Sequence, residues 1–385
     1  MARDVQTSNH AGTDGALGNH GRRGYIYANG RYWCFYNTSA QFCFTSSADG
    51  GVTWAAPTNI RASTSRNYED VYLQPGTNFI HYVWNGAGVF GDLFYRRGEL
   101  QADGTIVWTA AEVSAHNSGA QNYYLPTITV SDAGYATIVT TRAGQAELHR
   151  NARNDGTWVD DPNAAPKVLG AGDGGRAIPV NGTEDLIAIW FRNATNTVMA
   201  AKYQPGGGIW GATRTVLRAT STGWWMSYCE LPDGSGAMVS FIQNVTNVLS
   251  YAIFGWVADA WTTEADMDAA DVSTVTGELS CDKTGSRIFF FQRLTGAGTI
   301  RVRRWSSALG WGAATNWITG EVNLQNIVQV DVHPRSVAGD DRITAFWLTG
   351  AASPWQIRFD SYDLPASVSP PKSTPTQKMF GLMFA

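Results

Sequence analysis

Five residues have side chains that could carry acid–base or anion-binding chemistry, and they are the candidate catalytic residues: His116, Glu69, Asp70, Arg66 and Arg176. Glu69 and Asp70 are adjacent carboxylates, a pair that could serve as general acid and general base. His116 could act as a base because an imidazole titrates near neutral pH. The two arginines could bind a carboxylate through the guanidinium fork. For the carboxylate pair, the alternative of solvated loop side chains stays open.

A second set of side chains could bind a sugar. The apolar C–H faces of sugar rings stack on Trp or Tyr, while hydroxyl groups meet planar polar side chains. Trp224 and Trp225 lead this set, because one of two consecutive strand residues must point away from the sheet interior. The candidate ligand-binding residues are Trp224, Trp225, Tyr228, Tyr123, Tyr124, Trp84, Asn85, Arg142 and Arg192.

A repeat in the chain must position these side chains. Tryptophan recurs with a period of about 51 residues, at Trp54, Trp108, Trp158, Trp210, Trp261 and Trp311. Turn glycines recur in phase with these tryptophans, each between two apolar runs of strand length, which predicts a hairpin at each glycine. Seven such units are visible, each with room for four strands. The pattern predicts an all-β fold, a seven-bladed β-propeller with four-stranded antiparallel blades.

The seventh unit has no tryptophan-bearing fourth strand of its own. We expect residues 4–8, from Asp4 to Ser8, to supply it, because an unpaired sheet edge would otherwise be exposed. The predicted organisation is therefore an N-terminal segment (1–20) that completes the last blade, the propeller (21–364), and a Pro/Ser-rich linker with an apolar tail (365–385). The tail runs from Met379 to Ala385 and either packs back on the propeller or docks a protein partner.

Antiparallel blades place the candidate residues on one side of the ring. The connections between blades and the turns between the second and third strands share one face, here called the connection face. The other face, here called the hairpin face, carries the turns between first and second strands and between third and fourth strands. The candidate catalytic and ligand-binding residues fall on or near the connection face.

The most specific motif is SADGGVTW at residues 47–54, which fits the pattern S-x-D-x-G-x-T-W. We expect a tight turn in which the aspartate accepts backbone N–H groups, glycine takes a positive φ, and tryptophan packs between strands. The motif resembles the Asp-box of the sialidase (BNR-repeat) superfamily, and degenerate copies recur along the chain. In that superfamily the box is a structural turn. Its defined positions here are Ser47, Asp49, Gly51, Thr53 and Trp54.

The resemblance implies a propeller fold and does not carry over catalytic residues. A sialidase needs three arginines that grip a carboxylate, and a Tyr nucleophile with a Glu partner and an Asp acid/base. The superfamily's early Arg-Ile-Pro is not found before the first box, where Arg22-Arg23-Gly24 stands instead. Residues 79–84 and 93–98 more loosely resemble BNR-type propellers, some relatives of which are polysaccharide lyases.

Composition excludes several classes of protein. Charged residues make up only 16% of the chain and the net charge is -4, which argues against helix bundles and against nucleic-acid binding. No apolar run is long enough to span a membrane. The polar N-terminus has no signal-peptide pattern, so we expect synthesis in a cytoplasm, with a virion component reaching glycans after lysis.

The four cysteines have no metal-ligand spacing, and the sequence predicts no metal site and no cofactor. Cys34 and Cys43 are on adjacent predicted strands, and buried free thiols are favoured over a disulfide between them.

Three functions compete. The first is a lectin-like, carbohydrate-binding propeller, used as a surface or virion adhesion module such as a phage tail or capsid appendage. The second is a glycan-cleaving enzyme, either an exo-sialidase-like hydrolase or a polysaccharide lyase. The third is an architectural subunit of a larger particle or oligomer. The absent export signal, the missing arginine triad and the apolar tail together favour the first, with the third as a contributing role and a glycan or polysaccharide as the partner.

Overall fold

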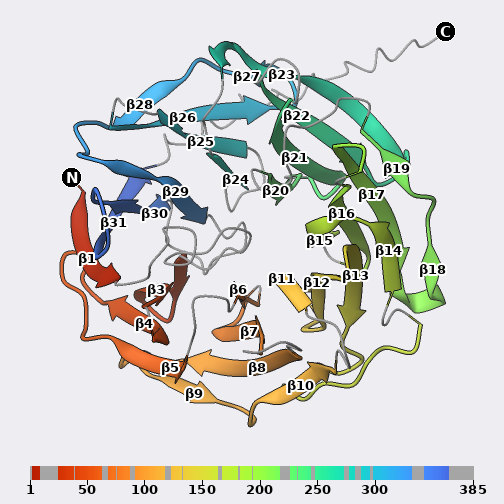
Figure 1. Ribbon diagram of the computed structural model, residues 1–385, viewed down its shortest axis with the longest axis horizontal. Helices are drawn as coiled ribbons and strands as arrows, with labels where there is room; N and C mark the ends of the chain where they lie inside the picture. The colour runs from red at the N-terminus through yellow and green to blue at the C-terminus, as the bar shows by residue number, and fades with distance from the viewer. Residues whose placement is uncertain are drawn as a thin grey trace, which may run out of the picture.

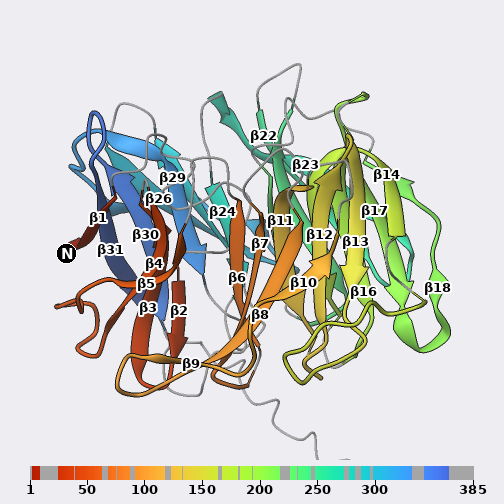
Figure 2. The same cartoon turned by 60° about the horizontal axis from the view of Figure 1, so that its bottom comes forward.

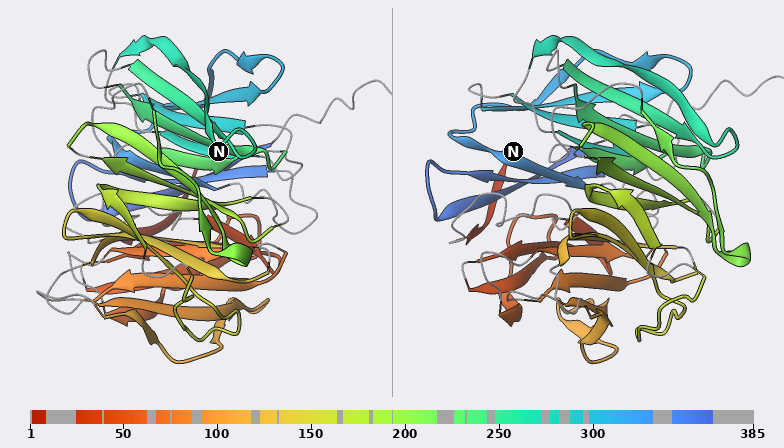
Figure 3. Two further views of the ribbon diagram at one scale, coloured as in Figure 1. Left: turned by 90° about the vertical axis from the view of Figure 1, so that its right-hand side faces the viewer. Right: turned by 45° about the vertical axis from the view of Figure 1, so that its right-hand side comes forward.

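The computed structural model of the protein describes residues 2–8, 25–38, 40–62, 68–74, 76–86, 92–117, 123–131, 133–163, 167–180, 183–192, 194–216, 226–231, 233–243, 248–272, 277–281, 288–294, 298–331 and 342–363. These residues form seven antiparallel sheets arranged as a ring (Figure 1). Seen from the side, the ring is a disc, with its strands running between the two faces (Figure 3). The predicted seven-bladed β-propeller is confirmed.

Each blade runs outward from an innermost first strand to an outermost fourth strand, and in blades 2, 4 and 6 the outer strand is split in two. Blade 1 contains β2 (Tyr25–Ala28), β3 (Arg31–Asn37), β4 (Gln41–Ser47) and β5 (Thr58–Ala62). Blade 2 contains β6 (Glu69–Leu73), β7 (Phe79–Asn85), β8 (Leu93–Leu100), β9 (Ile106–Trp108) and β10 (Val113–His116). Blade 3 contains β11 (Tyr123–Val130), β12 (Ala136–Arg142), β13 (Gln145–Arg150) and β14 (Lys167–Ala171).

The remaining blades follow the same order. Blade 4 contains β15 (Asp173–Pro179), β16 (Leu186–Arg192), β17 (Thr197–Gln204), a short 3-10 helix (Pro205–Gly207), β18 (Ile209–Trp210) and β19 (Arg214–Thr215). Blade 5 contains β20 (Ser227–Glu230), β21 (Gly236–Ile242), β22 (Val248–Gly255) and β23 (Ala260–Val272). Blade 6 contains β24 (Gly277–Cys281), β25 (Ile288–Leu294), β26 (Thr299–Ser306), β27 (Gly310–Trp311) and β28 (Thr315–Ile318). Blade 7 contains β29 (Leu324–Asp331), β30 (Arg342–Thr349), β31 (Trp355–Asp363) and β1 (Arg3–Ser8).

The N-terminal strand closes the ring. β1 pairs antiparallel with β31, with Arg3 opposite Phe359 and Ser8 opposite Trp355, and the two strands lie side by side in Figure 2. Val5 is buried against the core shared by blades 1 and 7. The hydroxyl of Ser8 donates to the carbonyl of Asn37 in blade 1, and so ties the closing strand to the next blade as well. The prediction that this segment completes blade 7 is confirmed, and the physical reason is that it covers the open edge of β31.

The core lies between blades. The second strand of a blade is covered on both faces by neighbouring blades, so its sequence is a continuous apolar run, as in β16 (LIAIWFR). The repeating tryptophans pack into these cores beside the preceding blade: Trp108 joins the blade 1–2 core, Trp158 the blade 2–3 core and Trp261 the blade 4–5 core. The repeating tryptophans therefore mark contacts between neighbouring blades. The prediction placed these tryptophans on fourth strands, whereas Trp54 and Trp158 precede those strands.

The turn at residues 47–54 has the contacts expected of it. The Asp49 carboxylate accepts the backbone N–H of Thr53 at 2.9 Å and the hydroxyl groups of Thr53 and Ser47. These hydrogen bonds hold the pKa of Asp49 well below its usual range. Gly51 has a φ of +82°, and a Cβ there would lie 2.1 Å from the ring of Phe359. The turn therefore locks blade 1 onto blade 7.

Two further expectations concern cysteine and membranes. Cys34 and Cys43 are buried free thiols, so the favoured alternative is confirmed. Among the described residues no helix is long and apolar enough to span a bilayer.

Candidate functional site

The candidate catalytic residues Asp70 and Arg176 form a buried ion pair near the centre of the ring. Arg176 Nη2 donates to Asp70 Oδ2 at 2.9 Å, and the same oxygen accepts the backbone N–H of Ile128 at 2.8 Å. Both side chains are almost fully buried. The three residues come from β6, β11 and β15, the innermost strands of blades 2, 3 and 4. This carboxylate therefore fastens three strands together.

Glu69 and Trp84 are also buried, beside an arginine from blade 1. Arg61 Nη1 lies 3.6 Å from Glu69 Oε1, and its guanidinium carbon lies 4.8 Å from the centre of the Trp84 ring. Trp84 is 1% exposed and stacks on Phe94 with a centroid separation of 5.5 Å. Glu69 is thus a buried strand residue and not a solvated loop carboxylate, and Trp84 has no face open to a sugar.

Asn85 has a structural role that fixes the edge of the next blade. Its side-chain oxygen accepts the backbone N–H of Tyr68 at 2.6 Å, and its amide donates to the carbonyl of Tyr123 at 3.1 Å. The contact spans blades 2 and 3 and sets the position of Tyr123. That tyrosine is the centre of the polar group described next.

Six side chains converge where blade 2 meets blade 3. This group, here called the seam cluster, consists of His116, Tyr123, Arg142, Glu147, His149 and Asp160. His116 ends β10, the outermost strand of blade 2, and the other five belong to blade 3. Tyr123 pairs with Arg142 across β11 and β12, while Glu147 and His149 are alternate residues of β13 and so share one face. Asp160 pairs with Asn151 just beyond β13.

The buried ring of Tyr123 is the hub of the cluster. His116 meets it edge to face with a centroid separation of 5.9 Å, and His149 does the same at 5.5 Å. The guanidinium carbon of Arg142 lies 5.8 Å from the ring centre. Burial raises the pKa of the Tyr123 hydroxyl well above its usual value, so this hydroxyl stays protonated.

Glu147 connects the arginine to the buried histidine. Arg142 donates to Glu147 Oε1 through Nε at 2.9 Å, with Nη2 at 2.8 Å from the same oxygen. Glu147 Oε2 lies 3.6 Å from His149 Nε2. Burial alone would raise the pKa of Glu147, but His149 and Arg142 outweigh burial and leave it below its usual value. Burial lowers the pKa of His149, against the opposing effect of Glu147.

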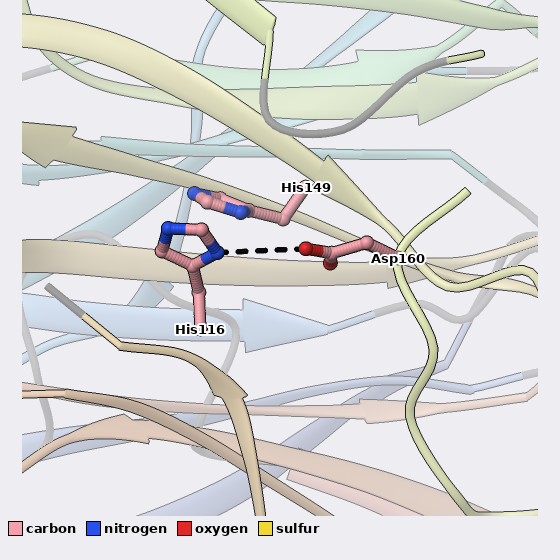
Figure 4. Close-up of side chains that lie close together, drawn as sticks. All are labelled: His116, His149 and Asp160. Atoms are coloured by element: carbon pink, nitrogen blue, oxygen red, sulfur yellow. Dashed lines mark hydrogen bonds and ion pairs between the residues drawn. The ribbon is translucent and has the colours of Figure 1, made fainter. Parts of the chain in front are cut away.

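His116 and Asp160 form the open side of the cluster. His116 Nδ1 lies 3.4 Å from Asp160 Oδ2, and the two side chains are 24% and 32% exposed. The His116 and His149 rings are 4.9 Å apart, and Figure 4 shows all three side chains directed toward one another. The other carboxylate oxygen, Asp160 Oδ1, accepts the indole N–H of Trp158 at 2.8 Å. One atom of each of the three side chains is therefore available to a shared ligand.

The remaining candidates are scattered or fall outside the described residues. Tyr124 is 44% exposed, and Arg192 is exposed at the end of β16. Tyr228 is buried, and its hydroxyl donates to the sulfur of Met226 at 3.7 Å. Arg66, Trp224 and Trp225 lie outside the described part of the chain.

Of the predicted site residues, the structure therefore brings together His116, Tyr123 and Arg142 in the seam cluster, and pairs Asp70 with Arg176. Sequence reasoning missed Glu147, His149 and Asp160, and so also missed that His149 and Asp160 could hold a metal ion together with His116. A signal for two of them was present. In β13 the polar residues Gln145, Glu147 and His149 alternate with apolar ones, which places them on one face of the strand.

Comparisons with known proteins identify similar folds. No protein-family profile matches the chain, and no curated protein does. An ulvan lyase of polysaccharide lyase family PL25, bound to -[GlcA(1-4)Rha3S]-, is 11% identical with a TM-score of 0.59, covering 92% of this chain and 95% of its own. An oligogalacturonate lyase in complex with manganese is 11% identical with a TM-score of 0.55, covering 95% and 98%.

A sialidase is among the structural neighbours too. NanB from Streptococcus pneumoniae is 10% identical with a TM-score of 0.50, covering 94% of this chain and 70% of its own. At these identities the likeness extends to the fold and no further. The chain is a seven-bladed β-propeller whose structural neighbours include propellers that act on glycans.

Proposed function

We propose that this protein is a lectin-like propeller that binds a polysaccharide, with the seam cluster as its recognition site. The observation that carries the proposal is the convergence of Arg142, His116 and Asp160 around the Tyr123 ring. These three polar side chains are 27%, 24% and 32% exposed. They offer donors and acceptors to solvent at one place, where two blades meet.

The cluster is rigid in the way that sugar recognition requires. Arg142 donates a hydrogen bond to the buried carboxylate of Glu147, and Asp160 accepts one from the indole N–H of Trp158. Polar groups that are already oriented lose little conformational entropy when a ligand arrives, which favours binding. The guanidinium and carboxylate are planar groups that match pairs of neighbouring sugar hydroxyls.

The structural neighbours support a glycan as the ligand. By their names, the ulvan lyase, the oligogalacturonate lyase and the sialidase NanB act on glycans. The motif at residues 47–54 resembles the Asp-box of the sialidase superfamily and forms the tight turn expected of such a box. Both points favour carbohydrate over a protein or nucleic-acid ligand.

A second candidate function is polysaccharide cleavage by β-elimination, and the pair of imidazoles beside Arg142 favours it. Arg142 would bind the carboxylate of a uronate, and His116 would remove the proton on the carbon next to that carboxylate. The electron pair left behind would form a carbon–carbon double bond as the bond to the glycosidic oxygen breaks. That oxygen would take up a proton, giving an unsaturated uronate and a new reducing end.

A glycan array probed with the intact chain tests the binding proposal, with Arg142→Ala as the test variant. Arg214→Ala is a control, because Arg214 is an exposed arginine of blade 4 that pairs with Asp259 of blade 5. We expect wild type and Arg214→Ala to bind the same polysaccharides and Arg142→Ala to lose at least tenfold in affinity. Equal binding by all three proteins would overturn the assignment of the site.

Ultraviolet absorbance of unsaturated uronate on a polysaccharide panel tests the second candidate. Turnover that is abolished in His116→Ala would replace the lectin-like assignment with a lyase. Binding without turnover supports the lectin-like one.

Use of the propeller as a surface or virion adhesion module is a further part of this proposal. It depends on the tail from Met379 to Ala385, which lies outside the described residues. Deleting residues 379–385 should abolish incorporation into a larger assembly and leave glycan binding intact. Unchanged incorporation would remove the docking hypothesis.

A further inference from the structure

His149 is a buried histidine with a ring nitrogen, Nδ1, that has no hydrogen-bond partner among the described residues. It is fully buried, and Nε2 has only the 3.6 Å contact with Glu147 Oε2. Leaving a buried polar group without a partner destabilises a fold, so such a group calls for an explanation. His81 gives the contrast: it is equally buried, but its Nδ1 meets the hydroxyl of Tyr95 at 2.8 Å and its Nε2 meets Gln74 Oε1 at 3.2 Å.

The surroundings of His149 have the spacing of a metal site. Ligand atoms of His116, His149 and Asp160 all lie within 4.8 Å of one another. Two ligands bound to a tetrahedral zinc ion lie about 3.3–3.6 Å apart, given bond lengths of about 2.0–2.2 Å. The 3.4 Å between His116 Nδ1 and Asp160 Oδ2 falls in that range and is long for a charge-assisted hydrogen bond.

The outer contacts orient each ligand atom toward the centre of the group. The indole N–H of Trp158 donates to Asp160 Oδ1, so Asp160 Oδ2 is the oxygen that could bind an ion. Glu147 Oε2 lies 3.6 Å from His149 Nε2, so His149 Nδ1 is the nitrogen that could bind the ion. A carboxylate behind a histidine is the usual outer partner of a metal-binding imidazole, because it fixes the ring and raises its basicity. Arg142 balances the charge of Glu147, so the carboxylate of Asp160 remains to attract a cation.

We propose that His116, His149 and Asp160 form a binding site for a divalent transition-metal ion, with zinc as the best match. Two imidazoles and one carboxylate are nitrogen and oxygen ligands suited to zinc, whereas calcium and magnesium prefer oxygen alone. Three protein ligands leave a fourth position for water or a ligand oxygen. The exposed edges of His116 and Asp160 make that position reachable from solvent.

The site has a consequence for the second candidate function. An imidazole that binds an ion through Nδ1 carries its proton on Nε2. Such a His116 cannot remove a proton from a sugar. Metal binding therefore favours the lectin-like function over elimination by His116. The proposal of a metal site does not depend on either candidate function.

Zinc titration of the intact chain, freed of metal by a chelator, tests the proposal by calorimetry. We expect one zinc ion per chain and a melting temperature that rises with zinc, because the ion binds the folded state. His149→Leu and Asp160→Asn should each weaken zinc binding by at least tenfold. His81→Gln is the matched control, since it alters a buried histidine elsewhere in blade 2 and should bind zinc as the wild type does.

Cobalt supplies a second readout that a purely structural role would not produce. Bound Co²⁺ should give visible absorption bands of a four-coordinate site in the wild type and in His81→Gln, and these bands should be missing in Asp160→Asn. Near-ultraviolet circular dichroism confirms that each variant is folded. A wild type that binds no zinc, or variants that bind it unchanged, would overturn the metal site and leave the glycan proposal standing.

Discussion

Asp70 and Arg176 lie 106 residues apart in the chain and meet in a buried ion pair, with Arg176 Nη2 at 2.9 Å from Asp70 Oδ2. The carboxylate also accepts the backbone N–H of Ile128 from the strand between them in the ring. The pair therefore couples the innermost strands of blades 2, 3 and 4. One of these strands, β11, also contributes Tyr123 to the seam cluster.

Removing the carboxylate of Asp70 should destabilise the fold strongly. Asp70→Ala leaves Arg176 charged and buried, and breaking one partner of such a pair costs about 3–5 kcal/mol. The double variant Asp70→Ala with Arg176→Met should lose less than the sum of the two single changes. Denaturant unfolding of the wild type, the two single variants and the double variant measures the coupling, and additive losses would show that the pair is not coupled. Arg214→Ala breaks an exposed pair with Asp259 and should cost less than about 1 kcal/mol.

The turn that locks blade 1 onto blade 7 should tolerate alanine at one glycine and not at its neighbour. Gly50 and Gly51 both have positive φ, but a Cβ on Gly50 meets nothing within 4 Å, whereas on Gly51 it overlaps Phe359. Gly50→Ala should therefore cost about 1–2 kcal/mol from backbone strain, and Gly51→Ala about 1–3 kcal/mol more from overpacking. Thermal unfolding of the two variants decides the order, and equal losses would contradict the contact with Phe359.

Closure of the ring by β1 predicts a difference between neighbouring residues of that strand. Val5 is buried in the blade 1–7 core, and Thr7 is exposed. Val5→Asp places an unpaired charge in the core and should lower the melting temperature sharply and expose the edge of β31. Thr7→Asp should leave stability within about 0.5 kcal/mol of the wild type. Similar behaviour of the two variants would mean that β1 is not seated in blade 7.

His81 should make stability depend on pH. Burial, with a smaller effect of Arg97, lowers the pKa of His81 to about 3. The unfolded chain takes up a proton near the ordinary pKa of about 6.5, so the folded state binds fewer protons between these two values. Stability should fall as pH falls through this window, by up to about 1.4 kcal/mol per pH unit from this residue.

His81→Gln removes the titrating group and keeps a side chain that can donate and accept hydrogen bonds. Unfolding free energies measured from pH 6.5 down to pH 4 should therefore show a shallower slope for the variant than for the wild type. Parallel slopes would mean that His81 binds its proton equally in both states.

The repeat and the ring closure could be predicted because their signals are local. Six of the seven blades carry a tryptophan of the repeat, every blade carries an apolar second strand, and the unit without a fourth strand was visible by comparison with the others.

The site could be predicted in part, because it is assembled from two blades. His116, Tyr123 and Arg142 were named from their place near the connection face. Nothing in the sequence shows that His116 and Arg142 both lie against the aromatic ring of Tyr123. Asp160 comes from an irregular loop without a motif. The burial of Glu69 and Asp70 depends on arginines in other blades, so two adjacent acidic residues gave no sign that they belong to the interior.

A crystal structure of the protein with the best-binding oligosaccharide from the array tests the central proposal most directly. We expect the sugar at the junction of blades 2 and 3, with its oxygens in contact with Arg142 and with His116 or Asp160. A sugar bound at another junction, or at the mouth of the central axis above Asp70 and Arg176, would contradict it.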